Sequence, residues 1–157
     1  MLVAGTGNIF LGDDGFGPEV IRHVTPDLGP GVVVADYGVG GLHLAYDLLD
    51  PWAALVLVDA VPDRGAPGTV HVFEADHESL SGATALDAHA MEPAAVFASL
   101  TALGGSAPRT VVIGCEVATV EEGIGLSAPV AAAVPAAVRA VQTTVAGLLA
   151  HAAAGRR

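Results

Sequence analysis

Residues 54–74 read "ALVLVDAVPDRGAPGTVHVFE", and this stretch decides the fold class. Its first part, "ALVLVDA" (54–60), is continuously apolar up to the aspartate, which is typical of a central parallel strand buried on both faces. Its last part, "TVHVFE" (69–74), alternates polar and apolar residues. Only "VPDRGAPG" (61–68) lies between them, too short for the crossover helix that a parallel connection requires. The second strand is therefore predicted to be antiparallel and to lie at an edge.

The rest of the chain alternates short β-branched runs with longer segments rich in Ala and Leu, which is typical of α/β layering around a mostly parallel sheet. The further predicted strands are 1–5, 31–37 and 109–115, and the predicted helices are 15–25, 41–50, 91–103 and 127–152. Ser127 is expected to cap the last helix, and Pro135 predicts a kink or restart within it.

Composition limits the possible functions. With 157 residues, 52% of them hydrophobic and 15% charged, the chain is expected to form a single globular domain, 1–157. A formal net charge of −11 disfavours nucleic acid and anionic membranes as partners. The single cysteine, Cys115, excludes an internal disulfide. Because no apolar run reaches the roughly 20 residues of a membrane span, a soluble, cytoplasmic protein is expected.

A glycine-rich turn, "GTGNIFLGDDGFG" (5–17), follows the first strand. It fails the dinucleotide fingerprint because Phe10 stands where the third glycine belongs, and no lysine completes a phosphate loop. Asp13 and Asp14 would repel phosphate but suit a cation, so a nucleotide-binding module is a weak alternative. Asp14 could also be a helix N-cap or first-turn acid, whereas Asp13 is interpreted as a capping or structural acid.

Acidic residues follow several of the predicted strands, where ligands bind in sheets of this kind. Asp59 ends an apolar strand, which is costly without a partner and therefore favours a functional role. The same argument favours a functional role for Asp36, but its carboxylate could instead accept a hydrogen bond within a local turn. Among the histidines, His89 in "ALDAHAME" (85–92) lies in a connection with acidic neighbours. Two carboxylates and an imidazole suit a divalent metal such as zinc or nickel.

The opening block "AGTGNIFLGDDGFGPEV" resembles the N-terminal signature of the hydrogenase maturation proteases, which trim the C-terminal tail of the large subunit of nickel–iron hydrogenases. Four further blocks resemble the family in the same order: "DYGVGGLHLAYDL" (36–48), "LVLVDAVPDRGAPGTV" (55–70), "DAHAMEP" (87–93) and "GCEVATVEEGIGLSAPVAAAV" (114–134). The resemblance implies a three-layer α/β/α sandwich of the phosphorylase/hydrolase-like kind. Its five-stranded mixed, mostly parallel sheet would carry an antiparallel edge strand.

The resemblance also implies site residues. The nickel-contacting and catalytic positions of the family match Asp14, Asp59 and His89. The substrate-binding positions match Asp36, Gly38, Gly40 and Gly41, although "DYGVGG" departs at Val39 from the expected D-x-G-T-x-G.

On function, the resemblance implies an endopeptidase that removes the C-terminal tail of a hydrogenase large-subunit precursor. Its recognition element would be nickel already inserted in the precursor, so no tightly bound cofactor is expected. One alternative stays open, namely a metallopeptidase or amidase of similar fold that holds its own divalent metal at the same residues.

Overall fold

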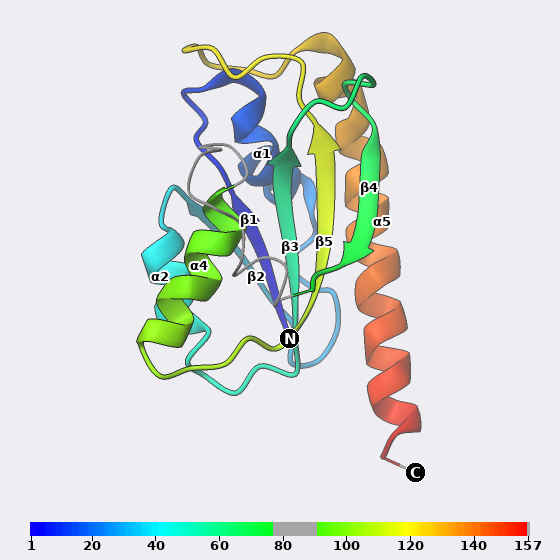
Figure 1. Cartoon of the computed structure of the whole chain (residues 1–157). Coiled ribbons are helices and arrows are strands. Elements are labelled where there is room, and N and C mark those ends of the chain that lie inside the picture. Colours follow the sequence, from blue (N-terminus) through cyan, green and yellow to red (C-terminus); the bar gives the residue numbers. More distant parts are fainter. Residues whose placement is uncertain (77–90, 157) are drawn as a thin grey trace.

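The computed structural model describes residues 1–76 and 91–156 and contains a five-stranded sheet in the order β2-β1-β3-β5-β4 (Figure 1). The strands are β1 (Leu2–Thr6), β2 (Val33–Gly38), β3 (Ala54–Val61), β4 (Val70–Glu74) and β5 (Arg109–Glu116). β1 pairs in parallel with β2 and β3, and β3 pairs in parallel with β5. β4 pairs antiparallel with β5 at the edge, which confirms the prediction from the short connection.

Helices cover both faces of this sheet (Figure 1). The elements are the 3-10 helix η1 (Gly12–Gly15) and the helices α1 (Phe16–His23), α2 (Gly41–Asp47), α4 (Met91–Ala102) and α5 (Ala128–Ala154). α1 packs with α5 on one face, and α2 packs with α4 on the other. The predicted three-layer α/β/α sandwich is thus confirmed, although α1 and α2 end two to three residues earlier than expected.

Residue alternation along the strands divides the core into two clusters. In β1, Val3 belongs to the cluster under α1 and α5, whereas Leu2 and Ala4 belong to the cluster under α2 and α4. In β3, Val56 and Val58 belong to the first cluster and Leu55 and Leu57 to the second. By the same alternation, Thr6 and Asp59 continue the face of α2 and α4.

Helix α5 runs through Pro135 without interruption, so the predicted restart is wrong. The proline removes one backbone donor, while Val134 and Ala137 on either side of it are buried against the sheet and hold the helix in place. By length and composition alone, α5 could cross a membrane. One face of α5, which includes Val130, Val141 and Val145, packs in the core against the sheet.

Candidate active site

Glycines bring η1 and α1 close to the ends of β1 and β3. Gly7 has a φ of 138°, and a Cβ atom there would overlap the carbonyl oxygen of Asp14. At Gly17, a Cβ atom would overlap the carbonyl oxygens of Thr6 and Val58. The glycine-rich sequence therefore serves a close backbone approach, which sets the acids of η1 beside the end of β3.

Asp13 is a fully buried structural acid. Its Oδ2 accepts hydrogen bonds from the backbone N–H groups of Ala118 and Thr119 at 2.8 and 3.1 Å. The Ser127 N–H donates to Oδ1 at 2.7 Å, and the Ser127 hydroxyl donates to Oδ2 at 2.8 Å. Burial raises the pKa of Asp13, but these hydrogen bonds outweigh it and hold the pKa below its ordinary value. Of the two sequence interpretations of Asp13, as a capping or as a structural acid, the geometry agrees with the structural one.

The bonds to Asp13 belong to a larger attachment between η1 and the loop of residues 117–127. The Gly12 N–H donates to the Gly123 carbonyl at 2.9 Å, and the Gly123 N–H donates to the Phe10 carbonyl at 2.8 Å. Ser127 occupies the N-cap position of α5, but its side chain makes no capping bond, and its hydroxyl donates to Asp13. The predicted capping bond is therefore absent.

Asp14 lies in η1 beside this anchor, with 9% of its surface exposed. Its Oδ2 accepts a hydrogen bond from the Asn8 N–H at 2.8 Å. The N-cap of α1 is Gly15, so the Asp14 carboxylate does not cap that helix. The alternative that Asp14 is an N-cap is thus wrong, and its carboxylate keeps acceptor capacity beyond the one bond to Asn8.

Asp59 is buried near the carboxyl end of β3, and its Oδ1 accepts a hydrogen bond from the Ala60 N–H at 2.8 Å. It lines a pocket of about 480 Å³ together with Arg64, His71 and Phe73. Because η1 packs against β3, Asp14 and Asp59 lie on contacting elements.

The third predicted ligand, His89, lies outside the described residues, so the complete set stays a prediction. Within residues 1–76 and 91–156, no three His, Cys, Asp or Glu side chains are grouped so that they could hold a metal ion.

The predicted substrate-binding residues lie at the end of β2 and the start of α2. The Asp36 Oδ1 accepts a hydrogen bond from the Gly38 N–H at 2.8 Å, so the local turn expected as an alternative does form. Gly38 ends β2, Gly40 is the N-cap of α2, and Gly41 is its first residue. The role of these residues in substrate binding stays a prediction.

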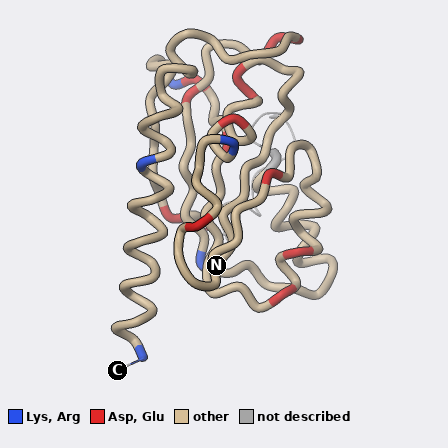
Figure 2. The backbone as a smooth tube through the Cα atoms, turned by 180° about the vertical axis from the view of Figure 1, so that it is seen from behind, with Lys and Arg blue, Asp and Glu red and all other residues tan. Residues whose placement is uncertain are grey.

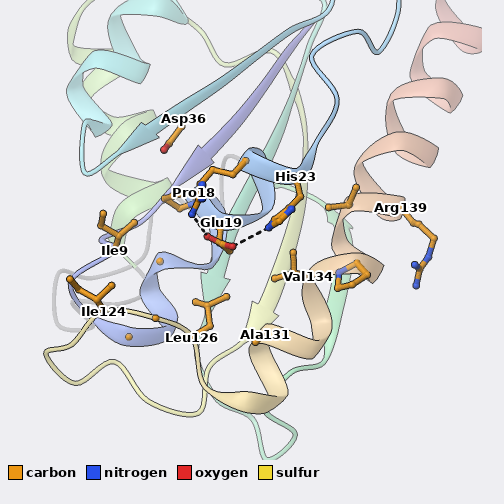
Figure 3. Close-up of a pocket in the computed structure, with 16 residues that line it drawn as sticks. Ile9, Pro18, Glu19, His23, Asp36, Ile124, Leu126, Ala131, Val134 and Arg139 are labelled. Carbon is orange, nitrogen blue, oxygen red and sulfur yellow. Dashed lines mark hydrogen bonds and ion pairs between the residues drawn. The ribbon is translucent and has the colours of Figure 1, made fainter.

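Asp36 also borders a pocket of about 830 Å³ between α1 and α5 (Figure 3). Apolar side chains such as Leu126 and Val134 line much of it. Glu19 in this pocket pairs with Arg22 and His23 at 3.0 Å each. The pocket lies on the opposite face of the sheet from Asp59, so the predicted site residues are divided between two faces.

Sequence reasoning missed a part-buried pair formed by Glu116 and His71. Glu116 Oε2 lies 2.7 Å from His71 Nε2, and its Oε1 accepts hydrogen bonds from the N–H groups of Arg64 and Ala66 at 2.7 and 3.3 Å. The bond with His71 and those from the backbone hold the pKa of the Glu116 carboxyl below its usual range. The signal that would have shown the pair is the antiparallel register. His71 lies opposite Gly114, and Glu116 is two residues further along β5 and therefore on the same face of the sheet.

Charge over the molecule is mainly acidic. The chain has 17 acidic residues against six basic ones, and Figure 2 shows acids over much of the fold with few arginines. A negative field of this kind favours cationic over anionic ligands.

Comparison with known proteins defines the class of this protein. The family model for hydrogenase maturation proteases matches residues 19–144, and the chain belongs to that family. It is a hydrogenase maturation endopeptidase.

Individual relatives agree with this assignment. The chain is 32% identical over 142 residues to the hydrogenase expression/formation protein HupD of Rhizobium leguminosarum, covering 88% of this chain and 70% of HupD. It is 31% identical to the coenzyme F420 hydrogenase subunit delta of Methanothermobacter thermautotrophicus, covering 90% and 91% of the two chains. Among solved structures, the hydrogenase maturating endopeptidase HybD of Escherichia coli superposes with a TM-score of 0.76 at 25% identity, covering 93% and 91%.

Proposed function

We propose that this endopeptidase removes the C-terminal tail of a nickel–iron hydrogenase large-subunit precursor after nickel has been inserted. In this proposal Asp14, Asp59 and His89 contact the nickel ion of the precursor. The enzyme then needs no tightly bound metal of its own, since the metal arrives with the substrate. We further infer that it acts in the cytoplasm.

The arrangement of Asp14 and Asp59 is the observation that carries this proposal. Both carboxylates lie near the carboxyl edge of the sheet, on the contacting elements η1 and β3. The buried bonds of Asp13 fix η1, so Asp14 is presented on a rigid support. Carboxylate oxygens and an imidazole suit a divalent nickel ion chemically.

Anchoring through the metal also accounts for hydrolysis of one selected bond. A precursor held at its nickel site places a nearby peptide bond at high effective concentration in the cleft. A water molecule then attacks the carbonyl carbon, the C–N bond breaks, and the leaving amine takes up a proton. Either the precursor's metal or a carboxylate of the cleft activates this water.

A cleavage assay on a purified hydrogenase large-subunit precursor tests the proposal. The precursor is supplied with and without nickel, and tail removal is followed by mass spectrometry. We expect cleavage of the nickel-loaded form only, and its loss in Asp14→Asn and His89→Ala. Asp63→Asn is the control, because Asp63 accepts a bond from Gly65 in an exposed turn and should retain full activity.

Two results would contradict the proposal. Full cleavage by both Asp14→Asn and His89→Ala would refute the site assignment. Stoichiometric metal in the enzyme purified without added metal, together with cleavage of a nickel-free precursor, would support the alternative in which the enzyme holds its own metal.

A further inference from the structure

The histidine of the Glu116–His71 pair lies in the same pocket as Asp59. Both Asp59 and His71 line the pocket of about 480 Å³ described above. Strands β3, β5 and β4 lie side by side (Figure 1), and Gly114 of β5 is the register partner of Asp59 on one side and of His71 on the other. Side chains in one row across a sheet point to the same face. Asp59 and His71 therefore face the same cleft.

Gly114 contributes no side chain to the space between these two residues. A Cβ atom at this position would overlap the side chain of Val61. Two strand spacings of about 4.8 Å separate the backbones of Asp59 and His71, which places them about 10 Å apart. An extended peptide covers this distance in about three residues. A precursor peptide held at Asp59 can therefore run across β5 to His71.

Glu116 is a buried carboxylate that holds the imidazole of His71 in place. Its side chain is 4% exposed, whereas that of His71 is 45% exposed and is open to the pocket. Oε1 of Glu116 accepts the backbone N–H groups of Arg64 and Ala66, which leaves Oε2 for His71 at 2.7 Å. The bond with His71 and those from the backbone hold the pKa of the Glu116 carboxyl below its usual range, so it is ionised at neutral pH. Because the bond uses Nε2 of His71, Nδ1 is left for a peptide.

A second histidine–glutamate pair, His23 with Glu19, shows the contrast. Its side chains are 57% and 32% exposed on α1 and four residues apart, a spacing at which such pairs form on any helix surface. The Glu116–His71 pair instead joins two strands across 45 positions and takes a carboxylate out of water, which is costly unless the charge is paired. A buried carboxylate that orients an imidazole in a cleft is an arrangement suited to proton transfer.

We propose that His71 donates the proton that the leaving amine takes up during cleavage, and that Glu116 positions His71 for this step. This inference deepens the proposed function and rests on it. In the imidazolium form, Nε2–H stays bonded to Glu116 while the proton on Nδ1 moves to the nitrogen of the breaking C–N bond. The proton that the attacking water releases then restores the imidazolium, so the net reaction consumes only water and the peptide bond. His71 is thus a catalytic residue and Glu116 a positioning residue.

Cleavage kinetics on a nickel-loaded precursor test this step. His71→Gln keeps a donor toward Glu116 but cannot transfer a proton, so kcat should fall by at least about 100-fold while KM changes by less than about threefold. His23→Gln is the matched control on the opposite face and should keep kcat within about twofold of wild type. Glu116→Gln should lower kcat at least about tenfold, because the amide does not stabilise an imidazolium, and should cost His71→Gln nothing further.

Chemical rescue separates proton transfer from a purely structural role. His71→Ala leaves room for a free ring, so added imidazole should raise its kcat at least about tenfold. Pyrazole has nearly the same shape but is a much weaker base, so it should restore no activity. Wild type in the same imidazole solution controls for effects on the nickel of the precursor. Rescue is measured within one variant, so it does not depend on the stability of the others.

A kcat of His71→Gln within about threefold of wild type, or equal rescue by imidazole and pyrazole, would refute the role of His71 while leaving the proposed function intact. If the wild-type enzyme itself leaves the nickel-loaded precursor uncleaved, the proposed function is wrong and the role of His71 is overturned with it.

Discussion

Replacing the neighbouring acids Asp13 and Asp14 one at a time should separate structural from functional carboxylates. Asp13 accepts four hydrogen bonds from a loop more than 100 positions further along the chain. In Asp13→Asn the amide oxygen can keep the three donors of Oδ2, but the amide N–H₂ then faces the Ser127 N–H. One charge-assisted bond, worth about 1.5–3 kcal/mol, is lost outright and the remaining ones lose their charge assistance.

We therefore expect Asp13→Asn to lower the free energy of unfolding by about 3 kcal/mol, a large part of the 5–15 kcal/mol typical of a domain. Asp14→Asn should cost less than about 1 kcal/mol, because its amide oxygen can still accept from Asn8. Urea unfolding followed by circular dichroism measures both values, and the cleavage assay is run on the same preparations.

The expected pattern is crossed: Asp13→Asn is less stable but still cleaves under conditions in which it is folded, whereas Asp14→Asn is stable and inactive. Equal stability losses in the two variants, or a stability loss below about 1 kcal/mol in Asp13→Asn, would refute the distinction drawn from the hydrogen bonds.

Three further results are expected. Gly17→Ala should lower the free energy of unfolding by about 3 kcal/mol, because its Cβ would overlap two carbonyl oxygens. Gly147→Ala, on the open surface of α5, should raise the free energy of unfolding by up to about 1 kcal/mol. Urea unfolding compares the two variants, and equal effects would contradict the packing around Gly17. Burial raises the pKa of Cys115 to about 11, so a thiol reagent at mildly alkaline pH should label the chain only after unfolding, and rapid labelling of the native protein would refute this. The folded-state pKa of Asp13 is lowered, so the stability it contributes is present above the unfolded pKa of about 3.9 and is lost as pH falls through the folded value. As pH falls, the free energy of unfolding should therefore decrease less steeply in Asp13→Asn than in wild type. Identical slopes of this free energy against pH would contradict the lowered pKa.

Local sequence was sufficient for most of the architecture. The eight residues between β3 and β4 exclude a crossover helix, and the alternation of "TVHVFE" indicates a sheet edge, so the antiparallel strand could be predicted without a relative. Continuous apolar runs marked β3 and β5 as central strands. These patterns depend only on residues close together in the chain, so the strands can be predicted from the sequence alone.

The details that local sequence did not predict depend on partners far away in the chain. Ser127 has the type and position of a capping residue, but its side chain makes no capping bond, and its hydroxyl donates to Asp13 more than 100 positions earlier in the chain. Pro135 breaks isolated helices, yet packing on the sheet keeps α5 continuous.

The attachment of residues 117–127 to η1 has a consequence for motion. A loop held at Ala118, Gly123 and Ser127 cannot open independently of the segment that carries Asp14. The backbone amides on both sides of this attachment should therefore exchange their hydrogens as one cooperative unit. Ile124 is 80% exposed and directly follows the anchored Gly123, so a partner that binds Ile124 would also affect the position of Asp14.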